Sequence, residues 1–224
     1  MLADARLVAG KDLRIELRSR VATNQVAPFG LLVLVLFAFA LDPDRGLLAR
    51  ASAGLFWVAV LLSALLAIQR SQAIEGADGA RDALRTSGLD PAGVFVGKAA
   101  AVAVELLVLE VVLGAGVIVL YGVDLQGVGL LVATCVVATV GLAAAGTLYG
   151  TLAAGLKVRE TLLPLLLLPV VAPVLLAATR ASEAALLGTV VDTDPAAWLR
   201  LLGVFAAVYV AFGVVAYGPL MEDS

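Results

Sequence analysis

The chain has 224 residues, 62% of which are hydrophobic, and a formal net charge of −3 at pH 7. The chain has no His and only one Cys. Its own residues therefore cannot form a Ser-His-Asp site, a Cys/His metal centre, an intrachain disulfide or a His-ligated haem. Its charges are spread along the chain and form no basic patch that would indicate binding to nucleic acid.

Residues 1–22 are predicted to form a helix that lies at the membrane interface. One stripe at helical spacing consists of small and apolar residues: Ala3, Leu7, Gly10, Leu13, Leu17 and Val21. Charged residues such as Asp4, Lys11 and Arg18 lie on the opposite side. Because two arginines interrupt the stripe, a juxtamembrane tail without fixed structure is the alternative. A cleaved signal peptide is not expected, because the charged region is long and carries acids as well as bases.

Uninterrupted apolar blocks follow, each close to the ~20 residues that a transmembrane helix needs, which predicts an all-α, polytopic membrane protein. The six expected spans are Val26 to Leu41, Ala51 to Ile68, Ala99 to Tyr121, Val128 to Leu156, Leu162 to Thr179 and Leu201 to Tyr217. The blocks are apolar on every face, unlike the alternating strands of an outer-membrane barrel. Little chain is left outside them, so residues 1–224 are predicted to form a single transmembrane domain.

The positive charges predict the orientation of these spans. Of 15 Lys and Arg residues, 11 lie in the N-terminal segment, the second connection and the fourth connection. The third connection carries none. The positive-inside rule therefore places the N-terminal segment, these two connections and both termini in the cytoplasm.

The connection over residues 69–98 is expected to be cytoplasmic and to carry a short helix on the membrane surface. A string of charged residues surrounds Leu84, which would anchor such a helix and offer a contact to a cytoplasmic partner.

Residues 93–99 have the wrong glycine spacing for a phosphate-binding loop, and Ala99 stands where a hydroxyl should hold magnesium. The chain alone is therefore not expected to hydrolyse ATP. Lys98 is expected to begin the third span, with its ammonium reaching the lipid headgroups.

Two carboxylates, Glu105 and Glu110, fall inside the third span, where a charge is costly unless it is protonated, paired or facing water. Their five-residue separation turns them about 140° apart around the helix, so they are expected to face different surroundings. Each is a candidate for a transport pathway, and bonding to a neighbouring helix is the alternative.

In the fifth span Pro164, Pro169 and Pro173 predict either fixed packing kinks or a hinge for alternating access.

The fourth span contains Gly146, Gly150 and Ala154, which follow the small-xxx-small pattern that lets helices approach closely. Packing against another helix of the same chain is one interpretation of this pattern. An interface between subunits is the other.

Several groups of residues occur along the chain in a characteristic order and spacing. They are Leu55-Phe56-Trp57-Val58, then Arg70, Glu75, Leu84 and Gly97-Lys98, and finally the stretches from Leu162 to Pro169 and from Ala172 to Leu175. Together with the total length, they resemble the haem exporter B family of cytochrome c maturation, CcmB. The resemblance runs over nearly the whole chain.

This resemblance implies an ABC-2-type (type V) exporter permease with an N-terminal interfacial helix, six spans and a cytoplasmic coupling helix. Small extracytoplasmic helices would occupy residues 181–197, within the connection 180–198. Such permeases lie in the inner membrane as dimers, bound to two copies of a separate, CcmA-like ATPase subunit. CcmC-like and CcmD-like membrane subunits would complete the assembly. Haem, ATP and magnesium would be handled by these partners, so that this chain would hold no cofactor.

The coupling helix implied by the resemblance covers residues 78–87. Leu84 would insert into a pocket of the ATPase, with Arg81 and Arg85 at the rim and Glu75 nearby.

Two other functions are alternatives: a permease of the same architecture that exports a lipid or glycan, and an ATP-independent, ion-coupled transporter that uses Glu105 and Glu110. Co-purification of an ATPase would exclude the second alternative.

Overall fold

A computed structural model describes residues 1–20, 22–41, 45–76, 88–154, 159–187 and 194–223, and all the regular elements in these ranges are helices. In chain order they are α1 (Leu2–Ser19), a short π-helix η1 (Ala22–Val26), α2 (Ala27–Leu41), α3 (Arg45–Gly76), α5 (Pro91–Tyr121), α6 (Val128–Ala154), α7 (Arg159–Leu187) and α8 (Pro195–Asp223). Within the described ranges, six helices are long and apolar enough to cross a membrane. The predicted all-α, polytopic fold is therefore confirmed.

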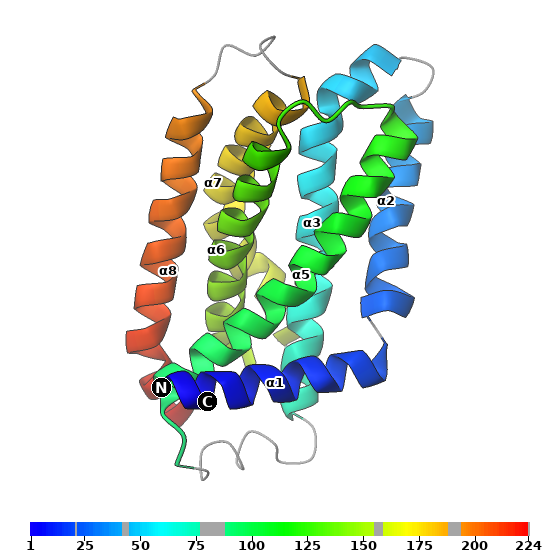
Figure 1. Ribbon diagram of the computed structural model, residues 1–224. Coiled ribbons are helices and arrows are strands. Elements are labelled where there is room, and N and C mark those ends of the chain that lie inside the picture. The colour runs from blue at the N-terminus through cyan, green and yellow to red at the C-terminus, as the bar shows by residue number, and fades with distance from the viewer. Residues whose placement is uncertain (21, 42–44, 77–87, 155–158, 188–193, 224) are drawn as a thin grey trace.

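The six long helices form one bundle, with α1 lying across one end of it (Figure 1). The N-terminus and the last turn of α8 lie at this same end, which we call the α1 end; the opposite end is the far end. In the bundle, α6 packs against α5, α7 and α8, while α3 packs against α2, α5 and α7. Each of these helices contributes a large, fully buried side chain to the interior: Leu34, Trp57, Leu106, Leu142, Leu167 and Leu202.

Most of the helices are longer than the apolar blocks that predicted them, because capping residues set some of their ends. α5 begins at Pro91, where the Asp90 carboxylate accepts a hydrogen bond of 3.3 Å from the Ala92 amide. It ends at Tyr121 and is capped by Gly122, whose φ of +64° is the left-handed conformation that suits glycine. The flanks of the expected 69–98 connection consequently belong to α3 and α5, and the expected coupling helix over 78–87 lies outside the described residues.

Two glycines allow α1 to lie directly on α5. A Cβ atom added at Gly97 would stand 2.6 Å from the carbonyl oxygen of Ala5, and one at Gly93 would stand 2.8 Å from that of Met1. The two glycines are four residues apart and therefore share a face of α5, as in the small-xxx-small contacts of membrane helices. The predicted N-terminal helix is thus present, and it is docked through backbone contact.

The expected position of Lys98 was wrong. Its side chain is only 2% exposed, and its Nζ lies 3.6 Å from Oδ2 of Asp12 on α1. Because α1 covers this part of α5, the ammonium lies under α1 and forms an ion pair there, whereas the sequence suggested that it would extend to the headgroups.

Substituting Gly97 by Ala is expected to lower the thermal midpoint of unfolding in detergent by about 5 °C. The added methyl group meets backbone atoms of α1, which cannot yield as a flexible side chain can, and overpacking of this kind costs about 1–3 kcal/mol. Gly114→Ala in the same helix is the control, because nothing lies within 4 Å of a Cβ added there. Equal midpoints for the two variants would contradict the close contact between α1 and α5.

The small residues of α6 pack within the chain. A Cβ atom added at Gly150 would lie 2.9 Å from Nε2 of Gln72 on α3. A Cβ atom added at Gly146 would collide with the side chain of Ile68, which is also on α3. The intramolecular interpretation of this pattern is therefore confirmed for Gly146 and Gly150.

At the far end, the expectation of separate small helices over residues 181–197 was wrong for the part that the structure describes. α7 continues unbroken to Leu187, and Pro195 is already the first residue of α8. The last turns of α7 are held in the core: the Trp57 indole donates a 2.9 Å hydrogen bond to Ser182, and the carbonyl of Ala185 accepts one of 2.9 Å from the Gly127 amide. These contacts favour continuation of α7 over a surface helix.

Candidate functional site

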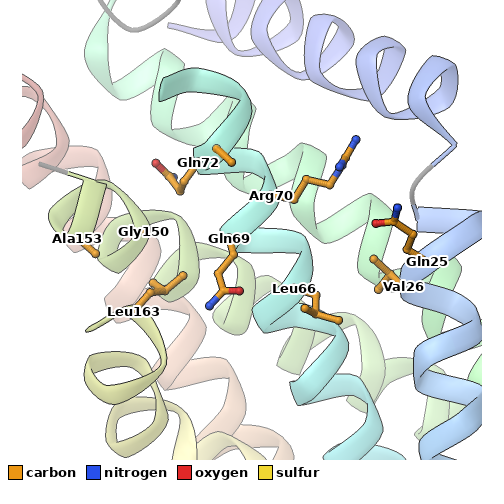
Figure 2. A pocket seen from close by; sticks show the side chains of 10 residues that line it. Gln25, Val26, Leu66, Gln69, Arg70, Gln72, Gly150, Ala153 and Leu163 are labelled. Atoms are coloured by element: carbon orange, nitrogen blue, oxygen red, sulfur yellow. The ribbon is translucent and has the colours of Figure 1, made fainter. Parts of the chain in front are cut away.

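A pocket of about 300 Å³ opens at the α1 end between η1, α3, α6 and α7 (Figure 2). Its polar lining comes from Gln25 on η1 and from Gln69, Arg70 and Gln72 near the end of α3. In Figure 2, the Gln72 side chain extends toward α6 at Gly150, whereas the Arg70 side chain points to the opposite side of α3. Amides and one guanidinium can bind polar or anionic groups by hydrogen bonds, but they offer no nucleophile or general base.

Arg70 connects this pocket to α1. Its Nε lies 3.8 Å from Oε2 of Glu16, whose other carboxylate oxygen accepts a 2.7 Å hydrogen bond from the Ala22 amide at the start of η1. Together with the pair between Asp12 and Lys98, this contact links α1 to both α3 and α5. These are the two helices that flank the expected coupling segment, so α1 is linked to both of them.

The N-terminal amine attaches the first turn of α1 to the start of α5. It lies 3.0 Å from Oδ2 of Asp4 and 3.4 Å from Oδ2 of Asp90. The hydrogen bond with Asp4 is the main cause that raises the pKa of the Met1 amine above its ordinary value of 8.0, with Asp90 adding to the effect. The amine is fully exposed, so we ascribe to it an orienting role more than a stabilising one.

The two carboxylates of the third span face different surroundings, as their spacing predicted. Glu105 lines a small pocket beneath α1 together with Asp12, Glu16 and Ser71, so it belongs to the α1 end. Glu110 is 4% exposed and accepts a hydrogen bond from Thr139 on α6. The alternative in which the carboxylate bonds to a neighbouring helix is therefore realised for Glu110.

Glu110 also borders an apolar space of about 560 Å³ between α5 and α6. The Cys135 thiol lies beside the same carboxylate. Both side chains are thus at the edge of a space that begins in the middle of α5 and extends toward the far end, where Leu125 and Val128 line it.

The prolines of the fifth span lie inside α7, which remains one helix from Arg159 to Leu187. Pro169 and Pro173 are exposed on the outside of the bundle, whereas Leu167 and Val171 face its core. The hinge interpretation stays a prediction.

Of the residues expected to contact an ATPase, Glu75 belongs to the last turn of α3, where the structure describes only the backbone. Arg81, Leu84 and Arg85 lie outside the described residues. The structure does place the two flanking helices: α3 ends and α5 begins at the α1 end (Figure 1).

Sequence reasoning missed the residues that build the contact between α1 and the bundle, above all Asp12 and Glu16. A signal was present: the two acids are four residues apart, so they share one side of a helix, and each faces a base at the end of an apolar span. Gln25 and Gln72 were missed as well, although a polar amide next to an apolar block is a recognisable feature.

Comparisons with known proteins agree with this architecture. The family model described as "CcmB protein" matches residues 4–222. A "Heme exporter protein B" of Bradyrhizobium diazoefficiens is 30% identical over 210 residues, which cover 92% of this chain and 93% of the relative. Proteins of the same name are 32% identical in Rhodobacter capsulatus, over 76% of this chain and 78% of the relative, and 34% identical in Paracoccus denitrificans, over 74% and 76%. Because the family match covers nearly the whole of a six-span helical bundle, this chain belongs to the CcmB family.

Proposed function

We propose that this chain is the permease subunit of a haem exporter that serves cytochrome c maturation. The family match over residues 4–222 carries this proposal. The relatives bear the name "Heme exporter protein B", and the six membrane-crossing helices are what a permease requires. Motion of the helices, driven from outside the membrane, is the role that this architecture supports best.

The source of the energy would be a separate, CcmA-like ATPase subunit, present in two copies beneath a dimer of this chain. The departure of residues 93–99 from a phosphate-binding loop supports an ATPase on another chain. CcmC-like and CcmD-like subunits would handle haem in the same assembly. The ATPase would press on the segment between α3 and α5, and the ion pairs from α1 to both helices would make the three helices respond together.

The coupling assignment is tested by substitutions in the 78–87 segment. Leu84→Asp is expected to detach the ATPase or uncouple its turnover, because a buried apolar anchor carries more interface energy than rim charges do. Arg81→Ala is the matched control and should have a smaller effect, mainly on association. Co-purification of the ATPase and its turnover in the complex are the measurements. Wild-type recovery and turnover in both variants would refute the contact, and failure of the wild-type chain to co-purify any ATPase would refute the ABC permease itself.

The proposed location is the inner membrane, with the α1 end in the cytoplasm, as the partition of basic residues favours. In a Cys135→Ser background, a cysteine at Asp124 should react with an impermeant thiol reagent added to intact cells. One at Ser87 should stay unlabelled until the cells are opened. Labelling of Ser87 from outside would invert the topology.

A further inference from the structure

The acidic and basic side chains of helix α1 lie in different surroundings. Its acidic side chains Asp4, Asp12 and Glu16 face the bundle, where they lie near the N-terminal amine, Lys98 and Arg70. All four of its basic side chains before the C-terminal cap are exposed, and they line one hollow: Arg6, Lys11, Arg14 and Arg18. Among them Lys11 also contacts Asp12, at 2.9 Å. The helix therefore presents a positive outer face, although its total charge is small.

The same outer face is apolar between the bases. Leu7 is 66% exposed and Leu17 is 77% exposed, while the contact to the bundle is made by the smaller Ala5 and Val8. The apolar stripe that predicted an interfacial helix thus points away from the protein. Large exposed leucines interleaved with bases are the pattern of a helix whose outer side meets a lipid surface.

A shallow hollow of about 380 Å³ lies on this face, lined by the four bases together with Leu7, Gly10 and Ile15. Nothing lies within 4 Å of a Cβ atom added at Gly10, so the backbone forms an open floor. Guanidinium groups at the walls can each donate two hydrogen bonds to phosphate oxygens, and the leucines can contact the first methylenes of acyl chains.

We propose that the outer face of α1, formed by Arg6, Leu7, Lys11, Arg14, Leu17 and Arg18, binds the headgroups of anionic phospholipids. The position of α1 in the bundle indicates that this surface meets the membrane. α1 packs against α5 and is followed by η1 and α2, so it lies across the bundle at the level where the spans end (Figure 1). Leu7 and Leu17 are exposed there, on the side of α1 that does not contact α5. The proposal stands on this geometry and does not depend on the cargo that the protein exports.

The test is a lipid titration of the purified chain in detergent, followed by native mass spectrometry. Phosphatidylglycerol is expected to bind about tenfold or more tightly than phosphatidylcholine, because several bases near a lipid surface each favour an anionic headgroup. The triple variant Arg6→Gln, Arg14→Gln, Arg18→Gln should lose this preference. The matched control removes three exposed arginines of the far end, with Arg50→Gln, Arg180→Gln and Arg200→Gln, and should keep it.

Further experiments distinguish binding of a lipid headgroup from binding of free phosphate. Leu7→Ser with Leu17→Ser should weaken binding of phosphatidylglycerol, and millimolar inorganic phosphate should not displace the lipid. Replacing the three arginines of α1 by lysine should retain the preference, which shows that loss in the glutamine variant is not loss of folding. Equal loss in both triple variants, or displacement by phosphate, would overturn the proposal. Retained lipid preference with loss of a co-purifying protein would overturn it in favour of a protein interface.

Discussion

Replacing Asp12 by Leu is expected to destabilise the protein by about 3 kcal/mol or more. The substitution removes the carboxylate that lies 3.6 Å from Lys98 and leaves an ammonium that is 2% exposed beneath α1. Removing one partner of a buried ion pair typically costs about 3–5 kcal/mol, because the remaining charge loses an attraction that offset part of its desolvation. The substitution should also loosen α1 from α5, since the pair joins these two helices.

The double variant Asp12→Leu with Lys98→Met separates this cause from a general loss of packing. With both charges replaced by apolar groups, most of the lost stability should return. Thermal unfolding in detergent measures stability, and a cross-link between cysteines placed on α1 and α5 reports the docking of α1. Asp124→Asn is the control, because this exposed acid lies in the connection between the end of α5 and the start of α6, away from α1. If the double variant is no more stable than Asp12→Leu alone, the ion pair is not the cause.

The sequence was sufficient to predict the six spans and the N-terminal helix, because each depends on a pattern within one segment. Apolar blocks of the right length predict membrane helices, and the spacing of Leu7, Gly10 and Leu17 predicts α1. The side of α1 that contacts the bundle could not be predicted from a pattern within one segment. It depends on Gly93 and Gly97, which lie far along the chain and whose importance appears only when α1 rests on them.

The candidate site was predicted less well, for a related reason. Ending the second span at the last apolar residue, Ile68, assigned Gln69, Arg70 and Gln72 to a connection, whereas α3 continues to Gly76 and carries them into the pocket. Helix ends depend on caps and on packing as well as on hydropathy, so a polar turn at the end of a span is easily assigned to a loop. The charged string around Leu84 indicated a contact to a cytoplasmic partner, and the family resemblance implied that this partner is an ATPase.

Replacing Trp57 by Ala is expected to cost about 4 kcal/mol, in the range of large-to-small substitutions in a packed core. Trp57 is 1% exposed, packs edge-on against Phe56 with ring centroids 5.3 Å apart, and donates the hydrogen bond to Ser182. Its loss would leave a cavity between α3 and α7 at the far end. Since α7 is the helix with three internal prolines, this contact fixes the end of the span that is most open to bending.

A graded series distinguishes packing from hydrogen bonding at this position. Trp57→Phe keeps much of the ring volume but leaves the buried Ser182 hydroxyl without its indole donor, which should cost about 1–3 kcal/mol. Adding Ser182→Ala to that variant removes the orphaned hydroxyl and should recover part of the loss. Thermal midpoints in detergent would rank the wild type first, then the double variant Trp57→Phe with Ser182→Ala, then Trp57→Phe alone, then Trp57→Ala. Equal midpoints for Trp57→Phe and Trp57→Ala would mean that ring packing contributes little, and α3 and α7 would then be held together mainly by their contacts nearer the α1 end.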